Sequence, residues 1–112
     1  MEPPYPDDDD GEVLRRVAAE GADMSRPMTI EYTIYAKDIH SARALAERIA
    51  AVGYTPRLYV DDEDGSISLY CARHMVATYE AVVACQEELN SLGHSVGAIC
   101  DGWLTAGNRQ GH

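Results

Sequence analysis

Apolar and polar residues alternate strictly through residues 28–36. The positions of one parity are Met28, Ile30, Tyr32, Ile34 and Ala36, and those of the other are Thr29, Glu31, Thr33 and Tyr35. Successive side chains of a strand point to opposite faces of a sheet, so this pattern predicts a strand with one buried face and one polar face.

Two later segments repeat apolar residues at helical spacing. The first follows Asp38, a good N-cap residue, and ends at Gly53, while the second begins at Thr78 and ends at Gly93. Their apolar faces comprise Ala42, Leu45, Ala46, Ile49 and Val52 in the first, and Val82, Cys85, Leu89 and Leu92 in the second. Both segments are predicted to be long helices that cover a core.

Three further strands are indicated between and after these helices. Residues 54–61 alternate, with Pro56 favouring an edge position or a strand start. Residues 67–71 alternate after an acidic turn, in which Asp64-Gly65 supplies the positive φ that a hairpin needs. A final short strand is predicted over residues 94–100.

The N-terminal residues are more polar. Residues 1–10 contain three prolines and four consecutive aspartates, which predicts an acidic disordered arm. A short helix from about Glu12 to Glu20 follows, with Asp10 as its cap and Gly21 as its stop. Its apolar face comprises Val13, Leu14 and Val17.

This order of elements predicts an α+β fold. After the short N-terminal helix, the βαββαβ order gives a ferredoxin-like split βαβ sandwich, with both long helices on one face of a four-stranded antiparallel sheet. The other face would hold Glu31, Thr33, Tyr35, Ser68 and Tyr70, and we expect the N-terminal helix to pack over its two tyrosines. The domain is predicted to span residues 11–106, followed by a flexible C-terminus over residues 107–112.

Charge restricts the class of partner. The net charge is −10 and the chain has only nine Lys and Arg residues, whereas nucleic-acid binding depends on clustered basic side chains. An acidic surface attracts basic protein segments instead. The candidate contacts are Asp7, Asp8, Asp9, Asp10, Asp61, Asp62, Glu63 and Asp64, with Tyr35, Tyr70 and the Asp101-Gly102-Trp103 segment as possible anchors.

The sequence contains no recognised catalytic or metal-binding motif. Cys71, Cys85 and Cys100 have no CxxC spacing, and no second pair accompanies Cys71 and His74 to complete a metal site. The acidic turn is too short for a calcium loop, and no nucleophile elbow or phosphate-binding loop occurs. We therefore expect a protein without cofactor or metal that is not an enzyme.

No membrane span or signal peptide is recognised in the sequence. A cytoplasmic location is therefore expected.

Several segments resemble the regulator of ribonuclease E activity B (RraB) family. They are Gly21 to Pro27 before the first strand, Gly53-Tyr54, Met75 with Thr78, and the closing Asp101-Gly102-Trp103, and the likeness covers roughly residues 12–105. The resemblance implies a ferredoxin-like protein inhibitor that binds the endoribonuclease E at an Arg-rich region and reduces RNA cleavage.

The chain departs from the family pattern at two places. It has Cys100 and Leu104 where known members have Tyr and Gly around the closing motif, and it ends at His112 where they continue into an acidic tail. If that tail engages the enzyme, the N-terminal aspartates would have to take its part, or the partner differs.

Two other classes of function fit the same residues. One is a binding module of the immunity-protein type, which neutralises an unrelated basic partner. The other is a small-molecule binder or enzyme that uses the open sheet face. The sequence is compatible with a monomer or with a homodimer formed by pairing open sheet faces.

Overall fold

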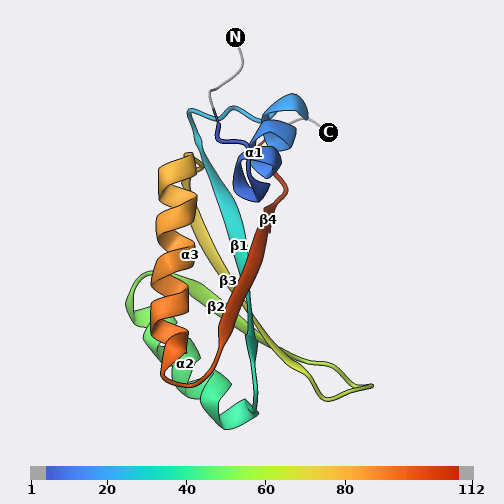
Figure 1. Cartoon of the computed structure of the whole chain (residues 1–112), viewed down its shortest axis with the longest axis vertical. Coiled ribbons are helices and arrows are strands. Elements are labelled where there is room, and N and C mark those ends of the chain that lie inside the picture. The colour runs from blue at the N-terminus through green and yellow to red at the C-terminus, as the bar shows by residue number, and fades with distance from the viewer. Residues whose placement is uncertain (1–4, 109–112) are drawn as a thin grey trace.

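The computed structural model describes residues 5–108 and places three helices and four strands there. In chain order they are α1 (Asp9–Ala19), β1 (Pro27–Ala36), α2 (Ile39–Ala51), β2 (Thr55–Val60), β3 (Ile67–Val76), α3 (Tyr79–His94) and β4 (Ile99–Thr105). The strands form one antiparallel sheet in the order β2-β3-β1-β4, and α2 and α3 lie on one of its faces (Figure 1). The predicted ferredoxin-like α+β fold is confirmed.

The core lies between this sheet and the helices. Strand β1 pairs with both β3 and β4, and its Met28, Ile30, Tyr32 and Ile34 side chains are buried on the helix side. Helix α2 adds Leu45 and Ile49 to this core, and α3 adds Val82 and Leu89. The alternation in residues 28–36 therefore identified the buried face correctly.

Local signals set most element boundaries. The Asp38 carboxylate accepts a hydrogen bond from the Ser41 backbone N–H at 2.7 Å, and the Thr78 hydroxyl accepts one from the Ala81 N–H at 3.1 Å. Asp38 is the predicted N-cap, and Thr78, predicted as the start of the second long helix, is the N-cap of α3. Gly65 has a φ of +72° in the β2–β3 hairpin, and β2 is an edge strand, as its proline indicated.

The last strand differs from its prediction. It spans Ile99–Thr105 instead of residues 94–100, because α3 continues to His94 and the chain then reverses, with the Ala98 N–H donating to the Gly93 carbonyl at 2.9 Å. Strand β3 is also longer than expected, since it continues past Cys71 to Val76.

A β-bulge explains why the alternation in β4 was missed. Tyr32 of β1 pairs with Trp103 and Ile34 pairs with Cys100, so Asp101 and Gly102 together stand opposite one residue of β1. Gly102 has a φ of +92°, which side chains with a Cβ rarely adopt. The extra residue puts both Cys100 and Trp103 on the helix side of the sheet, whereas in a regular strand they would point to opposite faces.

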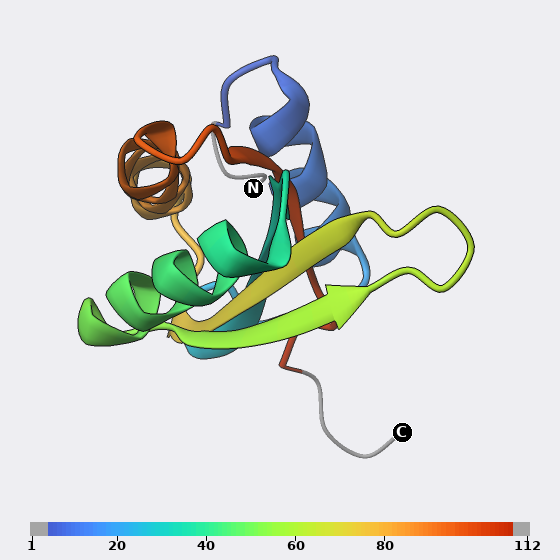
Figure 2. The same cartoon turned by 90° about the horizontal axis from the view of Figure 1, so that it is seen from below.

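Helix α1 lies beside α3 on the helix side of the sheet, next to β4 (Figure 2). Its Leu14 and Val17 side chains are buried in the common core. The expectation that this helix packs over Tyr35 and Tyr70 is therefore wrong, because its apolar face completes the core on the opposite side. The helix also begins earlier than predicted, since Asp8 is the N-cap and Asp10 lies within the first turn.

We expect Gly102→Val to destabilise the fold by about 2 kcal/mol, because a β-branched residue at positive φ is strained. Loss of the bulge would also turn the Trp103 ring toward water. Urea unfolding measures the first effect, and a red shift of Trp103 fluorescence measures the second. Gly102→Asn should lose less, because Asn tolerates positive φ; equal losses for the two variants would contradict this explanation.

Candidate protein-binding surface

Trp103 is an internal contact between β4 and α1. Its partly buried ring packs against the core, and its Nε1–H donates to Asp10 Oδ1 at 2.9 Å. The same oxygen accepts a hydrogen bond from Gln86 Nε2 of α3 at 3.0 Å. The Asp10 carboxylate therefore connects α1 to both β4 and α3.

Asp8 makes a second connection between α1 and α3. Its Oδ1 accepts from the Gly11 backbone N–H at 2.8 Å, and its Oδ2 accepts from the Tyr79 hydroxyl at 2.5 Å. The Tyr79 bond is the main cause that lowers the pKa of Asp8, and the Asp8 carboxylate raises the pKa of Tyr79 to about 12. Asp7 is fully exposed, with its Oδ1 3.9 Å from Arg15 Nη2, and Asp9 is exposed. Of the four aspartates predicted to meet a partner, Asp8 and Asp10 therefore accept internal hydrogen bonds, and Asp7 lies within ion-pair distance of Arg15.

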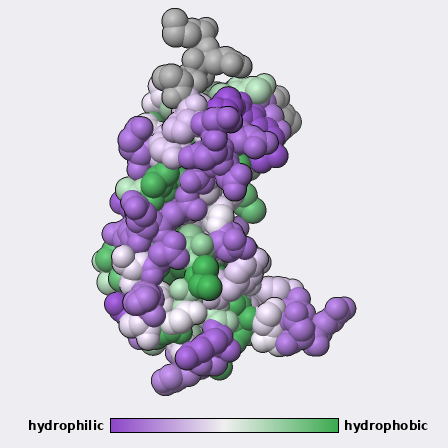
Figure 3. Space-filling view, viewed as in Figure 1, coloured by the Kyte–Doolittle hydropathy of each residue, from purple (hydrophilic) through white to green (hydrophobic). Residues whose placement is uncertain are grey.

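The acidic hairpin tip projects beyond the body of the domain and is hydrophilic (Figures 1 and 3). Asp61 Oδ1 accepts from the backbone N–H groups of Glu63 at 2.8 Å and Asp64 at 3.2 Å. Asp64 Oδ1 accepts from the Ser66 N–H at 2.8 Å, which lowers the pKa of Asp64. Asp61 and Asp64 thus shape the turn, while the exposed side chains of Asp62 and Glu63 have no hydrogen bond or ion pair within residues 5–108.

The sheet face opposite the helices carries exposed tyrosines. Tyr35 and Tyr59 are each 48% exposed, and the Tyr59 and Tyr70 ring centroids are 6.4 Å apart. The Arg57 guanidinium lies 4.8 Å from the centroid of Tyr70, and its Nη2 is 3.6 Å from Glu31 Oε2. The structure therefore places Tyr35 and Tyr70 on one face as predicted, and Tyr70 is already stacked against Arg57.

Sequence reasoning missed Tyr59 and Arg57 on this face. Both have the parity opposite to Leu58 and Val60 in the alternating segment 54–61, and that parity was the signal that could have found them. Asp101, also proposed as a contact, is exposed in the bulge of β4. Trp103 thus packs against the core on the helix side, whereas Asp101, only two residues earlier, is exposed to solvent.

Groups that could support chemistry are dispersed. Cys71 is buried on the helix side of β3, whereas His74 is exposed and its Nδ1 lies 3.3 Å from Thr29 Oγ1, so these two side chains cannot share a metal ion. Among residues 5–108 no three His, Cys, Asp or Glu side chains are grouped as metal ligands. Burial raises the pKa of Cys71 to about 12 and that of Cys100 to about 11, which keeps both thiols protonated at neutral pH.

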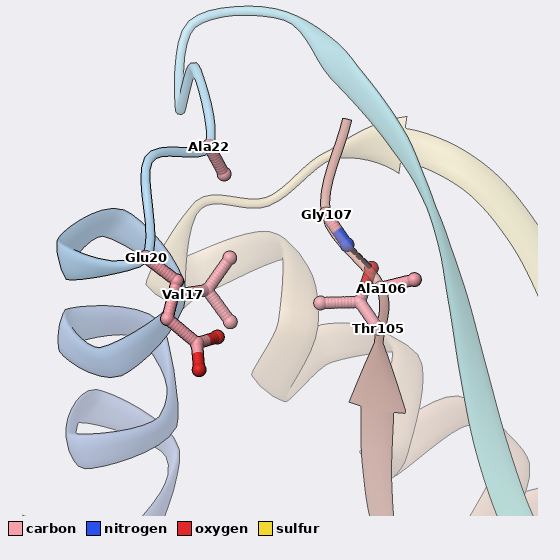
Figure 4. A pocket seen from close by; sticks show the side chains of 6 residues that line it. All are labelled: Val17, Glu20, Ala22, Thr105, Ala106 and Gly107. Atoms are coloured by element: carbon pink, nitrogen blue, oxygen red, sulfur yellow. Dashed lines mark hydrogen bonds between the residues drawn. The ribbon is translucent and has the colours of Figure 1, made fainter. Parts of the chain in front are cut away.

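A small cavity lies between the end of α1, the α1–β1 loop and the end of β4 (Figure 4). Its volume of about 30 Å³ suits one or two water molecules and not a metabolite. It is lined by Val17, Glu20, Ala22, Thr105, Ala106 and Gly107.

Of the helices in the described part of the chain, none is long and apolar enough to cross a bilayer.

Residues 7–105 match the family described as Regulator of ribonuclease activity B, RraB. The chain belongs to the RraB family. The match extends from the N-cap region of α1 through all four strands, so α1 is part of the family's domain and not an addition to it. A comparison with curated proteins found no match. The family is one of regulators of ribonuclease activity.

We expect Asp10→Ala to lower the free energy of unfolding of this RraB-family protein by about 2 kcal/mol, because two hydrogen bonds to a carboxylate are lost and the Trp103 Nε1–H is left without its acceptor. Asp9→Ala is the matched control, since it removes an equal charge from the same helical turn. Urea unfolding of both variants is the measurement. A loss for Asp9→Ala as large as that for Asp10→Ala would contradict the assigned contact.

The Asp8–Tyr79 bond predicts a pH window of stability. The pKa of Asp8 is lower in the folded protein, so its contribution is present above its unfolded value of about 4 and is lost as pH falls through the folded pKa. The pKa of Tyr79 is raised to about 12, so its contribution is present below its unfolded value of about 10 and is lost as pH rises toward 12. Tyr79→Phe should therefore be less stable than the wild type within this window, and the difference should shrink outside it.

Urea midpoints of the wild type and Tyr79→Phe across a pH series measure this difference. The difference between their tyrosinate absorbance titrations gives the pKa of Tyr79 directly. Asp8→Asn should shift that pKa back toward 10, the ordinary value for a tyrosine. A constant stability difference at every pH would show that the two groups are not linked.

Proposed function

We propose that this protein binds ribonuclease E, or a related basic ribonuclease, and lowers its cleavage of RNA in the cytoplasm. Membership of the RraB family carries the proposal, because the family regulates ribonuclease activity. The net charge of −10 supports a partner whose contact surface is basic. Direct binding to RNA is disfavoured for the same reason.

The acidic hairpin is the surface best placed for the first contact. Asp61 to Asp64 project from the domain, and the hydrogen bonds of Asp61 and Asp64 to the backbone hold the turn in shape. Asp62 and Glu63 are then available to pair with Arg or Lys side chains. An ordered anionic loop of this kind accelerates encounter with a cationic segment and competes with RNA for it.

The proposed action is binding without catalysis. The thiols of Cys71 and Cys100 stay protonated at neutral pH, which makes both weak nucleophiles. Regulation would then follow from occupancy of a cationic region on the ribonuclease.

The test is a titration of the full chain into purified ribonuclease E at two salt concentrations, with binding and cleavage of a short RNA followed together. We expect saturable binding that weakens at high salt and slows cleavage. The double variant Asp62→Asn/Glu63→Gln should bind several-fold more weakly at low salt and show a smaller salt effect, because two unpaired charges are removed.

The double variant Asp7→Asn/Asp9→Asn is the matched control for charge, since it removes two exposed carboxylates from the α1 end of the molecule. Wild-type affinity in this control places the contact at the hairpin. Absence of binding by the wild type at both salt concentrations would refute the proposal and favour an unrelated basic partner.

A further inference from the structure

The open sheet face has one row of side chains that crosses all four strands beside the acidic hairpin. The pairing Tyr59↔Ser68↔Tyr35↔Ile99 runs from β2 through β3 and β1 to β4. Tyr59 and Tyr35 are 48% exposed and Ile99 is 64% exposed, whereas Ser68 between the tyrosines is only 7% exposed. The row therefore presents two exposed rings, with one small buried residue between them, and an exposed isoleucine. The hairpin carboxylates start two residues after Tyr59.

The adjacent row shows how this face accommodates a guanidinium. There Arg57 stacks over the ring of Tyr70 at 4.8 Å and pairs with Glu31 at 3.6 Å. An aromatic face and a carboxylate together satisfy a planar cation better than either does alone. Arg57 thus shows, within this protein, that a guanidinium on this face can stack on a tyrosine and pair with a carboxylate at the same time.

The first row offers aromatic rings without a cation, and the hairpin that follows Tyr59 adds the carboxylates. Within the described strands, Arg57 and His74 are the basic residues on this face, and neither is in the row of Tyr35 and Tyr59. Lys37, the one lysine of the chain, is exposed two residues after Tyr35, and its side chain lies beside Gly97 ahead of β4. The Asp62 and Glu63 side chains have no hydrogen bond or ion pair among the described residues. The rings of this row and the charge of the hairpin are therefore complementary to an arginine side chain supplied from outside.

We propose that the open sheet face is the docking surface for an arginine-bearing protein segment, whose guanidinium groups stack on the exposed rings of Tyr35 and Tyr59. The adjacent Asp62 and Glu63 carboxylates pair with the same or a neighbouring arginine. This inference rests on the proposed function, since it specifies the surface that a basic ribonuclease would meet. Lysine fits less well, because an ammonium ion is strongly hydrated and does not stack as a planar group.

The test uses two labelled model peptides of equal length and charge, one alternating Gly with Arg and one alternating Gly with Lys. Fluorescence anisotropy with the full-length protein should show about tenfold tighter binding of the Arg peptide, as expected for two exposed cation–π contacts. Tyr35→Ala/Tyr59→Ala should reduce the two affinities to the same value, and Tyr35→Phe/Tyr59→Phe should keep the preference because the ring faces remain.

Two controls separate the rings from other effects. Leu104→Ala removes a side chain that is 56% exposed on the same sheet face, and it should leave the preference for Arg unchanged. Asp62→Asn/Glu63→Gln should weaken both peptides by similar factors, because it removes charge and not stacking. The Trp103 emission spectrum, which reports the opposite face, should be the same in all variants and so show that each one is folded.

Equal binding of the two peptides to the wild type would overturn the inference, and so would a preference for Arg that survives Tyr35→Ala/Tyr59→Ala. Sedimentation of the wild type as a dimer that this variant dissociates would also overturn it, because the face would then be occupied by a second copy. A retained preference for Arg without binding to ribonuclease E would support this surface and reject only the identity of the partner.

Discussion

The two faces of β1 set the arrangement of the molecule. This strand lies at the centre of the sheet and pairs along its length with β3 and, on its other side, with β4. Its inward side chains are buried, Tyr32 completely, so the face toward α2 and α3 cannot take part in recognition. A shift of one residue in the pairing would exchange Tyr32 for Thr33 and leave a polar strand against the core. The same constraint directs Glu31, Thr33 and Tyr35 to the opposite face.

The position of α1 decides whether that opposite face is free. The helix lies beside α3, and Asp10 joins it there to Trp103 and Gln86. Trp103 can reach Asp10 only because the Asp101-Gly102 bulge turns it to the helix side. A short irregularity in the last strand therefore contributes to exposing the tyrosines of the other face, since it helps to hold α1 away from them.

Most of the fold followed from patterns that depend on local physics. The alternation in β1, the N-caps Asp38 and Thr78 and the glycine of the hairpin each act within a few residues, so the sequence alone was sufficient to predict them. The start of the first helix was predicted too late, because any of the consecutive aspartates can serve as a cap. The contact of Asp8 with Tyr79, which favours the earlier start, cannot be read from the sequence. The boundaries predicted for the last strand were wrong because Asp-Gly is a turn signal in most contexts, whereas here it forms a bulge.

The site was harder to predict than the fold, because it depends on pairing between strands. Tyr35 and Tyr70 were identified as sharing a face, but which of them is available depends on Arg57, whose distance to each ring is not a property of the sequence. Likewise, a run of aspartates predicts charge, but not that Asp8 and Asp10 contact other parts of the same domain.

A carboxylate can act on a partner in two ways, by long-range attraction and by direct pairing. The internal contacts of each carboxylate show which of these it can do. A carboxylate that accepts hydrogen bonds within the protein remains charged, so Asp8, Asp10, Asp61 and Asp64 still contribute to the long-range field that draws a cationic partner. Pairing at contact distance is easiest for a carboxylate without internal partners, however, and the side chains of Asp62 and Glu63 have none in residues 5–108. A field attracts lysine and arginine alike, and only a group with a shaped face can distinguish them. Specificity would therefore come from the tyrosine row, and speed of association from the acidic surface. Because both lie at the same end of the sheet, one cationic segment could meet the two in sequence.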